Sequence, residues 1–234
     1  RFNDGDSAYM HKTPSSGGSA TTWTYSVWVK RSTIGTSQRI MSNGNQDGAG
    51  TYDTQIQFRT DDKINFDVYT NGVTTGNYFS NRVFRDVGAW YHFVFVWNTT
   101  SGTSSLNGST SDRMQLWVNG VQESSFSGHT SSSPVIPSQN AEDLGSNSTS
   151  YAMRFGTRAS SLYFDGYLAE VCWIDGSALT ASSFGEFDED SPTIWKPKDV
   201  SGLTFGTHGF YLDFEASDNL GNDANGGTDL TEVN

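Results

Sequence analysis

Cysteine, proline and charged side chains are all scarce in this 234-residue sequence. Because Cys172 is the one cysteine, no intrachain disulfide can form, and the fold must depend on its hydrophobic core. The four histidines are scattered, without the close His or Cys spacing of a zinc site. No apolar run approaches the ~20 residues that a membrane-spanning helix needs. These absences favour a domain that is stabilised by packing.

Basic residues are few as well. The chain has 14 Lys and Arg against 26 Asp and Glu, which gives a net charge of −12. This charge would repel phosphate backbones and anionic membranes, so we expect neither a nucleic-acid partner nor membrane insertion. The chain begins at Arg1 rather than at a methionine, which favours a domain or a processed product of a longer protein.

Aromatic residues, in contrast, make up 14% of the chain. Residues 90–97 (WYHFVFVW) carry apolar or aromatic side chains on both alternating faces, a pattern that is typical of a strand covered on both sides. Residues 23–31 alternate, with Trp23, Tyr25 and Val27 on one face. Together these stretches predict an all-β fold, an antiparallel β-sandwich.

Two Asn-Gly pairs, at 71–72 and 119–120, predict tight hairpins. A type I′ turn needs positive φ at both central residues, and Asn and Gly are the residues that adopt it most readily. Residues 54–59 and 63–70 are predicted to be two strands joined by a short acidic turn. Residues 77–86 are ambiguous between a loop and a short strand.

A further strand is predicted over residues 167–174. Strict alternation would place its side chains in two sets: Tyr167, Ala169, Val171 and Trp173 on one face, and Leu168, Cys172 and Ile174 on the other. Residues 177–184 are the one stretch that favours a helical turn, with Thr180 as its N-cap. On this strand Cys172 would act as a small hydrophobic residue.

Four segments, at 23–32, 90–97, 116–121 and 164–171, together resemble the concanavalin A-like lectin/glucanase superfamily, specifically its laminin-G-like branch. The resemblance implies a jelly roll of two curved antiparallel sheets. Residues 1–234 would form a single laminin-G-like jelly-roll domain. Its end, 199–234, would supply a closing strand and a turn-rich tail.

The sequence GFYLDF at 209–214, followed by NLGND at 219–223, is similar to versions of this domain in structural proteins of marine bacteriophages. That similarity implies a tail fibre, spike or capsid fibre, located extracellularly on the virion surface. Other virion proteins and further copies of the same chain, in a homo-oligomeric fibre, would be its partners. The superfamily also holds lectins and hydrolases, so its fold alone does not define an activity.

Carbohydrate binding is predicted at six residues that combine carboxylates, an amide and aromatic rings: Asp47, Tyr52, Asp53, Tyr69, Asn77 and Tyr78. Short polar groups can hydrogen-bond sugar hydroxyls, and an aromatic ring can stack on a sugar ring. The residues cluster in two stretches, 43–53 and 69–78. The alternative is that both stretches are ordinary surface turns, which have the same composition.

A calcium ion is the one cofactor that the sequence leaves open, because laminin-G-like domains often hold one. Oxygen ligands are offered near the end of the chain by Asp218, Asn219, Asn222, Asp223 and Asn225. Their spacing is not that of the twelve-residue calcium loop, and turns stabilised by Asn and Asp side chains explain them equally well. We therefore predict no metal or other cofactor.

Three carboxylates at Glu186, Asp188 and Asp190 have the i, i+2, i+4 spacing that glycanases of the superfamily use. They follow the 167–174 strand, however, where a catalytic strand of this family would not be expected. A solvated acidic loop is the preferred interpretation, so the protein is not expected to be an enzyme. We predict a non-catalytic module that adheres to host-surface glycans. The alternatives are a purely structural or oligomerising fibre domain and, ranked last, a secreted glycan hydrolase.

Overall fold

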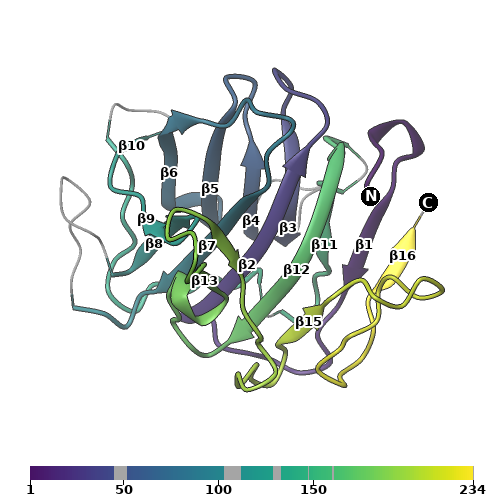
Figure 1. Ribbon diagram of the computed structural model, residues 1–234. Helices are drawn as coiled ribbons and strands as arrows, with labels where there is room; N and C mark the ends of the chain where they lie inside the picture. Colours follow the sequence, from purple (N-terminus) through teal and green to yellow (C-terminus); the bar gives the residue numbers. More distant parts are fainter. Residues whose placement is uncertain (45–51, 103–111, 129–132, 147, 160, 234) are drawn as a thin grey trace.

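The computed structural model describes residues 1–44, 52–102, 112–128, 133–146, 148–159 and 161–233. Two antiparallel sheets pack face to face in it, with β2 and β12 in the near sheet of Figure 1 and β3 to β6 behind them. The predicted all-β class and antiparallel sandwich are confirmed. No helix in these ranges is long and apolar enough to span a membrane.

The larger sheet has eight strands. In spatial order they are β10 (Phe126–Ser127), β6 (Val73–Val83), β5 (Lys63–Thr70), β4 (Tyr52–Phe58), β3 (Gln38–Gly44), β11 (Met153–Phe155), β1 (Tyr9–Lys12) and β16 (Thr231–Val233). The middle of this sheet is a run of antiparallel neighbours, β3 to β6, that follow one another along the chain. The region predicted to be ambiguous, 77–86, contributes to the long strand β6.

The smaller sheet has six strands. In spatial order they are β15 (Phe210–Leu212), β12 (Gly166–Asp175), β2 (Thr22–Arg31), β7 (Tyr91–Asn98), β8 (Met114–Val118) and β9 (Val121–Gln122). The end of the chain therefore adds a strand to each sheet, because β15 joins this one and β16 joins the larger one. Both chain ends lie beside β1 and β16 (Figure 1).

Three short elements complete the fold. They are the two-stranded hairpin of β13 (Gly185–Phe187) and β14 (Trp195–Pro197), and the 3-10 helices η1 (Asp4–Asp6) and η2 (Ala181–Ser183). The predicted helical turn corresponds to η2. Thr180 occupies its N-cap position, as predicted, although the Thr180 side chain makes no capping hydrogen bond. Its hydroxyl instead lies 3.0 Å from the Ser182 hydroxyl.

Both predicted Asn-Gly hairpins are confirmed. Asn71 and Gly72 have φ of 53° and 74°, and Asn119 and Gly120 have φ of 47° and 80°. These values belong to the left-handed region that a type I′ turn requires. The first pair joins β5 to β6, and the second joins β8 to β9.

The main core lies between the two sheets and is built largely of aromatic rings. The Trp23 ring stacks on the Trp173 ring at a centroid distance of 4.7 Å, and the Phe66 ring lies 5.4 Å from that of Trp23. All three side chains are fully buried. Such contacts add roughly 0.5–1.5 kcal/mol per ring pair to the free energy gained from burial, which compensates for the modest aliphatic content.

A second apolar cluster covers the outer face of the six-stranded sheet. Its buried members come from the sheet and from the segment after β12: Val94, Val96, Cys172, Ile174, Ala181, Phe184, Val200 and Phe205. This cover explains why β7 is apolar on both faces, since Phe93 and Phe95 point into the main core while Val94 and Val96 face the cover. Cys172 is buried there, as predicted for a small hydrophobic residue.

The predicted alternation along β12 is wrong at its centre. Leu168 packs in the main core together with Val171 and Trp173, although their sequence parity differs. The cause is a β-bulge between Ala169 and Cys172, where the pairing with β2 shifts in register and Glu170 has a φ of 49°. One extra residue in a strand reverses the faces of the residues that follow it.

Candidate functional site

The outer face of the eight-stranded sheet carries polar side chains where the inner face carries the core. On β4 and β5 the inward residues are apolar, so the residues between them point out of the sandwich. A cavity of about 700 Å³ opens on this outer face. It is lined by Ser37, Arg39, Asp53, Gln55, Gln57, Arg59, Thr60, Asp67, Tyr69, Gly72 and Arg158. Its size is in the range of small-molecule sites.

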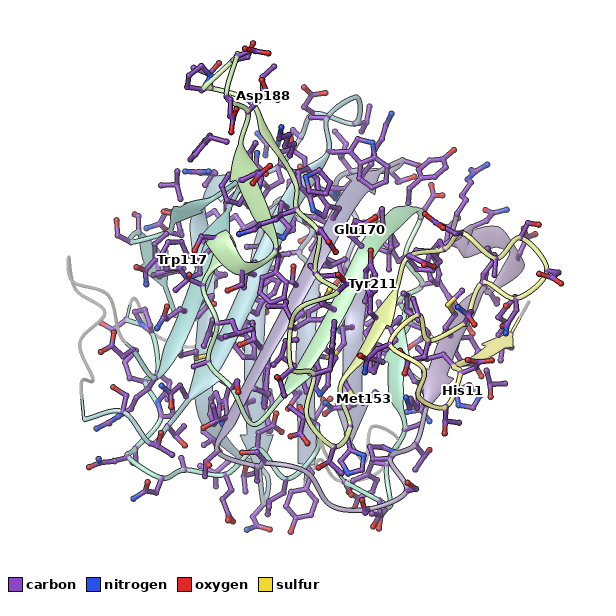
Figure 2. The ribbon with its side chains drawn as sticks, turned by 60° about the horizontal axis from the view of Figure 1, so that its bottom comes forward. His11, Trp117, Met153, Glu170, Asp188 and Tyr211 are labelled. Atoms are coloured by element: carbon purple, nitrogen blue, oxygen red, sulfur yellow. The ribbon has the colours of Figure 1, made fainter. Side chains whose placement is uncertain are left out.

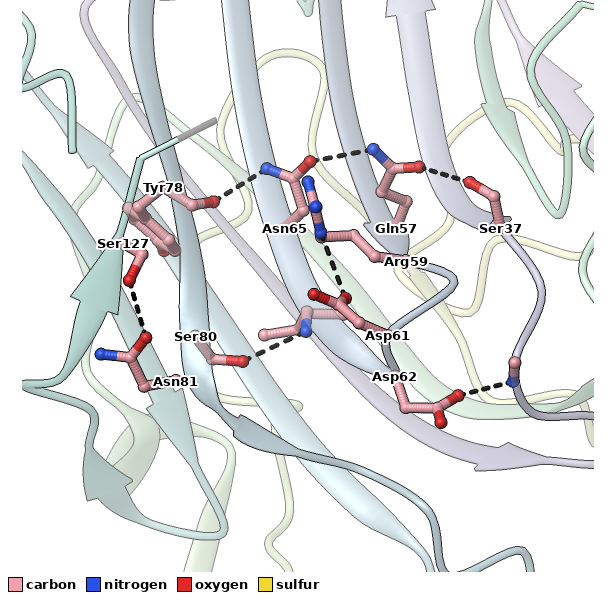
Figure 3. A network of polar contacts seen from close by, with 12 residues as sticks. Ser37, Gln57, Arg59, Asp61, Asp62, Asn65, Tyr78, Ser80, Asn81 and Ser127 are labelled. Carbon is pink, nitrogen blue, oxygen red and sulfur yellow. Dashed lines mark hydrogen bonds and ion pairs between the residues drawn. The ribbon is translucent and has the colours of Figure 1, made fainter. Parts of the chain in front are cut away.

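A row of hydrogen bonds runs across the strands (Figure 3), and two of its members, Ser37 and Gln57, line the cavity. The Ser37 hydroxyl donates to Gln57 Oε1 at 3.0 Å, and Gln57 Nε2 donates to Asn65 Oδ1 at 2.9 Å. Asn65 Nδ2 in turn donates to the Tyr78 carbonyl at 2.8 Å and to Asp67 Oδ1 at 3.1 Å. Each amide in the row is thus held in one orientation before any ligand arrives.

Arg158 and Asp53, which both line the cavity, form an ion pair. Arg158 Nη2 donates to Asp53 Oδ2 at 3.0 Å, and Gln55 Nε2 donates to the same oxygen. Asp53 is nearly buried, and burial raises the pKa of its carboxyl although Arg158 and Gln55 oppose that shift. Asp53 Oδ1 and Arg158 Nε are buried without a hydrogen-bond partner among the described residues. This side of the cavity therefore holds one acceptor and one donor that no described residue uses.

Tyr69 supplies the aromatic surface of the cavity. It lies on β5 opposite Asp53 of β4, so the ring and the carboxylate are neighbours across the two strands. Burial raises the pKa of the Tyr69 phenol, and the nearby Asp67 carboxylate acts in the same direction. The phenol is therefore neutral at physiological pH and can donate a hydrogen bond.

Of the six predicted sugar-binding residues, the structure brings Asp53 and Tyr69 together in the cavity. Asn77 is buried beside it and donates to the Asp67 carboxylate through Nδ2. Tyr52 lies nearby at the start of β4, where its hydroxyl donates to Asn71 Oδ1 at 2.9 Å. Tyr52 does not line the cavity.

Of the remaining two predicted residues, Tyr78 does not contribute to the cavity. Tyr78 is fully buried in the main core, where its ring lies 4.4 Å from that of Phe126, so it cannot reach a ligand. Its strand neighbour Asn77 points outward, and a residue adjacent in a strand must point the opposite way. Asp47 lies outside the described residues.

The sequence analysis did not predict most of the polar residues that the strands contribute to the site. Beside the predicted Asp53, Gln55 and Gln57 alternate with core-facing residues on β4, and Asn65 and Asp67 do so on β5. Two consecutive strands with polar residues at every second position signal a shared polar sheet face. Arg158, distant in sequence, gave no comparable signal.

The acidic residues proposed for calcium serve as turn and pairing groups. Asp223 Oδ1 accepts from the backbone N–H of Tyr211 and Asn225, at 3.0 and 3.1 Å. Its other oxygen lies 3.6 Å from Lys12 Nζ. No group of three or more His, Cys, Asp or Glu side chains suited to a metal occurs among residues that the structure describes.

The acidic residues weighed for catalysis lie on the β13–β14 hairpin, which projects from the molecule with Asp188 near its tip (Figure 2). Asp188 accepts from the backbone N–H of Asp190 and Ser191, each at 3.0 Å, and from Lys196 Nζ at 3.1 Å. Glu186 Oε1 lies 3.7 Å from the same ammonium. None of these residues lines the cavity.

The sandwich belongs to the class of concanavalin A-like folds. The laminin G family model described as the concanavalin A-like lectin/glucanases superfamily matches residues 3–183, so the chain belongs to this family. A search of the curated proteins gave no match.

A comparison with solved structures found similar chains at low sequence identity. They include a heptameric SAP-like pentraxin from Limulus polyphemus, 14% identical, with a TM-score of 0.45 over 74% of this chain and 71% of the pentraxin. Domains LG4-5 of the mouse laminin alpha1 chain are 10% identical, with a TM-score of 0.46 over 89% of this chain and 45% of the laminin fragment. The CBM40 of a Ruminococcus gnavus sialidase, bound to α2,3 sialyllactose, is 11% identical, with a TM-score of 0.46 over 74% of this chain and 91% of the CBM40.

Proposed function

We propose that this domain is a non-catalytic carbohydrate-binding module and that the cavity on the eight-stranded sheet is its binding site. The observation that carries the proposal is the ordered row from Ser37 through Gln57 to Asn65, because Ser37 and Gln57 line the cavity together with Tyr69. Fixed amides match the donors and acceptors of sugar hydroxyls, and an aromatic ring provides an apolar surface for a sugar face.

Preorganisation supports this function because binding then costs little conformational entropy. Gln55 and Gln57 are 6% and 8% exposed, so their rotamers are already restricted by packing and by hydrogen bonds. A ligand would replace water at groups that do not need to reorder. The cavity is also formed mainly by strand residues, which hold their positions better than loop residues do.

A non-catalytic role is supported by the state of the two aspartates in the cavity. The Asp53 carboxylate is paired with Arg158, and Asp67 accepts from Asn65 and Asn77. Glycoside hydrolysis requires two carboxyl groups that face the scissile bond, one of them able to donate a proton. Carboxylates held by amides and a guanidinium suit the binding of hydroxyl groups.

The wider setting that we propose is an extracellular one, on a virion surface, within a tail fibre, spike or capsid fibre. The similarity of residues 209–214 and 219–223 to marine bacteriophage structural proteins supports it. A homo-oligomeric fibre, anchored by other virion proteins, would present several copies of the cavity to a host-surface glycan. Several weak sites on one particle raise the overall avidity without any new contact.

A glycan array probed with the multimerised domain tests this function. We expect binding to a restricted set of glycans, and loss of that binding in Tyr69→Ala. Tyr167→Ala is the matched control, because Tyr167 is a half-exposed tyrosine on β12 of the other sheet. Absence of binding above background to every glycan would contradict the proposal and favour a purely structural or oligomerising domain.

A further inference from the structure

The charge of the cavity is opposite in sign to that of the chain. Arg39, Arg59 and Arg158 line it together with Asp53 and Asp67, so three positive and two negative groups leave a formal charge of +1. The whole chain carries −12. A locally positive, concave surface on an acidic protein indicates a site for a compact anionic group, at short range, where the distant charges are screened by salt.

Among the residues of the cavity, Arg39 is the one whose contacts indicate the chemical class of the ligand. Its side chain lines the cavity, and the residue is only 6% exposed. Nη1 donates to the Ser37 hydroxyl at 3.3 Å, while Nε is buried and has no hydrogen-bond partner among residues whose placement is described. In the described part of the chain, no carboxylate lies within ion-pair distance of this guanidinium.

Two other buried arginines of this protein have more hydrogen-bond acceptors around their guanidinium groups than Arg39 has. Arg31 pairs with the Asp62 carboxylate at 3.1 Å and also donates to the Phe84 carbonyl. Arg113 donates to backbone carbonyls, among them those of Ser101 and Pro137. A buried charge is costly unless it is paired or hydrogen-bonded. Nε and Nη2 of Arg31 are also buried without a hydrogen-bond partner among the residues that the structure describes, but Arg31 has the Asp62 carboxylate as its counter-ion. Arg39 has one hydroxyl acceptor, that of Ser37, and no ion-paired carboxylate among the described residues.

The geometry of Arg39 also defines the missing acceptor. With Nη1 held by Ser37, the edge formed by Nε and Nη2 is the one left for a ligand. Two parallel N–H groups on this edge match the two oxygens of a carboxylate. Burial lowers the pKa of Arg39 to about 10, with Arg158 adding to the effect, so the guanidinium is still charged at neutral pH.

A hydroxyl-binding group lies near the arginines. Asp53 Oδ1 is a buried acceptor without a partner, and the Asp53 carboxylate is fixed through Oδ2 by Arg158. Arg39 and Asp53 lie on the adjacent strands β3 and β4 and line the same cavity. A ligand with an anionic oxygen pair and hydroxyl groups would satisfy both, which neither a neutral sugar nor a bare carboxylate does.

We propose that the cavity binds a sugar acid, with its carboxylate on the Nε–Nη2 edge of Arg39 and a hydroxyl donated to Asp53 Oδ1. This inference rests on the proposed carbohydrate-binding function and names its ligand class. The ligand is a sugar with an isolated carboxylate rather than a densely sulfated polymer, because the net charge of −12 disfavours an extended polyanion.

Titration calorimetry with matched sugar pairs tests the proposal on the full chain. Each pair is a uronic acid oligosaccharide and its carboxyl-reduced neutral counterpart, in the gluco, galacto and manno series, with the methyl ester as a third form. In the series that binds, we expect the acid to bind about ten-fold or more tightly than the neutral sugar or the ester. Equal or tighter binding of the neutral form would overturn the sugar-acid assignment and leave the carbohydrate-binding function standing.

Variants of Arg39, with a control arginine outside the cavity, test which residue causes the preference for the acid. Arg39→Gln is expected to abolish the difference between acid and neutral sugar, and Arg39→Lys to restore part of it, because lysine keeps the charge but lacks the two-pronged edge. Arg82→Gln is the control, since Arg82 is an exposed arginine on β6 of the same sheet that pairs with Glu123 at 3.2 Å and does not line the cavity. Preference that persists in Arg39→Gln would overturn the role of Arg39. Should Arg39→Gln fail to fold, the ester and the reduced sugar still test the wild-type protein.

A sulfated oligosaccharide is included as a further arm. Tighter binding of the sulfated chain than of the uronic acid would overturn the choice of a carboxylate. Absence of binding in every series, on the array and by calorimetry, would overturn the carbohydrate-binding function together with this inference. The two failures are therefore distinguishable.

Discussion

The outer faces of the two sheets differ in what they present. The six-stranded sheet is covered by an apolar layer that includes Phe184, Val200 and Phe205, with the β13–β14 hairpin packed on it through Trp195. The eight-stranded sheet has amides, carboxylates and arginines at the equivalent outward positions, and a cavity opens there. One outer face thus adds to the free energy of folding, and the other leaves its side chains available to a ligand.

Glu170 and Tyr211 illustrate how the covered face handles polar groups. They point toward each other on β12 and β15 (Figure 2), and the Tyr211 hydroxyl donates to Glu170 Oε2. His92 is likewise satisfied, because its Nδ1 accepts from the Trp195 indole at 2.9 Å and its Nε2 lies 2.8 Å from the Ser26 hydroxyl. These titratable groups are matched within the protein, although the buried Trp28 Nε1 beside His92 has no hydrogen-bond partner among the described residues. On the open face the unmatched atoms, Arg39 Nε and Asp53 Oδ1, belong to charged side chains.

The largest change in the free energy of unfolding should come from shortening a side chain of the apolar cluster that covers the six-stranded sheet. Phe205 is 4% exposed and stacks near Tyr211, so Phe205→Ala should lower the free energy of unfolding by about 3–5 kcal/mol. Urea denaturation measures this loss, and sugar binding by the remaining folded protein should be unchanged. Val87→Ala, at an exposed position, is the control. A stability loss no greater than that of Val87→Ala would show that the cover is not part of the core.

The second largest effect is expected in the pH dependence of the free energy of unfolding. Burial lowers the pKa of His92 to about 3, while an unfolded histidine titrates near 6.5. Below pH 6.5 the unfolded state therefore binds a proton that the native state refuses, so stability is lost as pH falls. Between pH 7 and pH 5 the loss from His92 should be about 2 kcal/mol.

Urea denaturation at both pH values, in the wild type and in His92→Gln, isolates this contribution. The amide of glutamine can accept from Trp195 and donate to Ser26, but it does not titrate. Asp53 and Asp143, whose pKa values are raised by burial, act in the opposite direction and are common to both proteins. An equal pH dependence in both would contradict the prediction.

A smaller loss of stability is expected from a substitution on the outer face of the eight-stranded sheet. Gln57→Ala removes the centre of the hydrogen-bonded row and leaves the Ser37 and Asn65 side chains without that partner. The free energy of unfolding should fall by about 1 kcal/mol, and sugar affinity should fall as well. Thermal unfolding and calorimetry measure the two quantities. A sugar affinity equal to that of the wild type would argue that the hydrogen-bonded row is not part of the binding site.

The smallest effect should be that of Glu186→Gln on the projecting hairpin. Its carboxylate is exposed and 3.7 Å from Lys196 Nζ, and exposed ion pairs contribute little. The unfolding midpoint and sugar binding should both equal those of the wild type. A polysaccharide-cleaving activity that disappears in this variant would revive the hydrolase alternative.

Local signals in the sequence were sufficient for the turns and for the buried strands. The Asn-Gly pairs need a conformation that few residues tolerate, and the 90–97 run has no polar face, so both predictions depend on neighbouring residues alone. The bulge at Glu170 was missed, because a positive φ at a glutamate leaves no local pattern. Its cause lies in the pairing of β12 with β2.

The site was predicted only in part for a similar reason. Asp53 and Tyr69 were selected as a carboxylate and an aromatic residue near turns, and Tyr78 was selected on the same basis, although it faces the core. Gln55 and Gln57 have the composition of any solvated strand face. Arg158 lies 105 positions after Asp53 in the chain, and only the pairing of β11 with β3 brings the two near each other.

Backbone amide shifts in an NMR titration test the central claim most directly, namely that the open face of the eight-stranded sheet is the binding surface. The ligand would be the tightest-binding oligosaccharide of the calorimetric series. We predict that the largest shift changes fall on residues 53–59, residues 65–69 and Arg158. Changes confined to residues 177–206, on the covered face of the other sheet, would contradict the account.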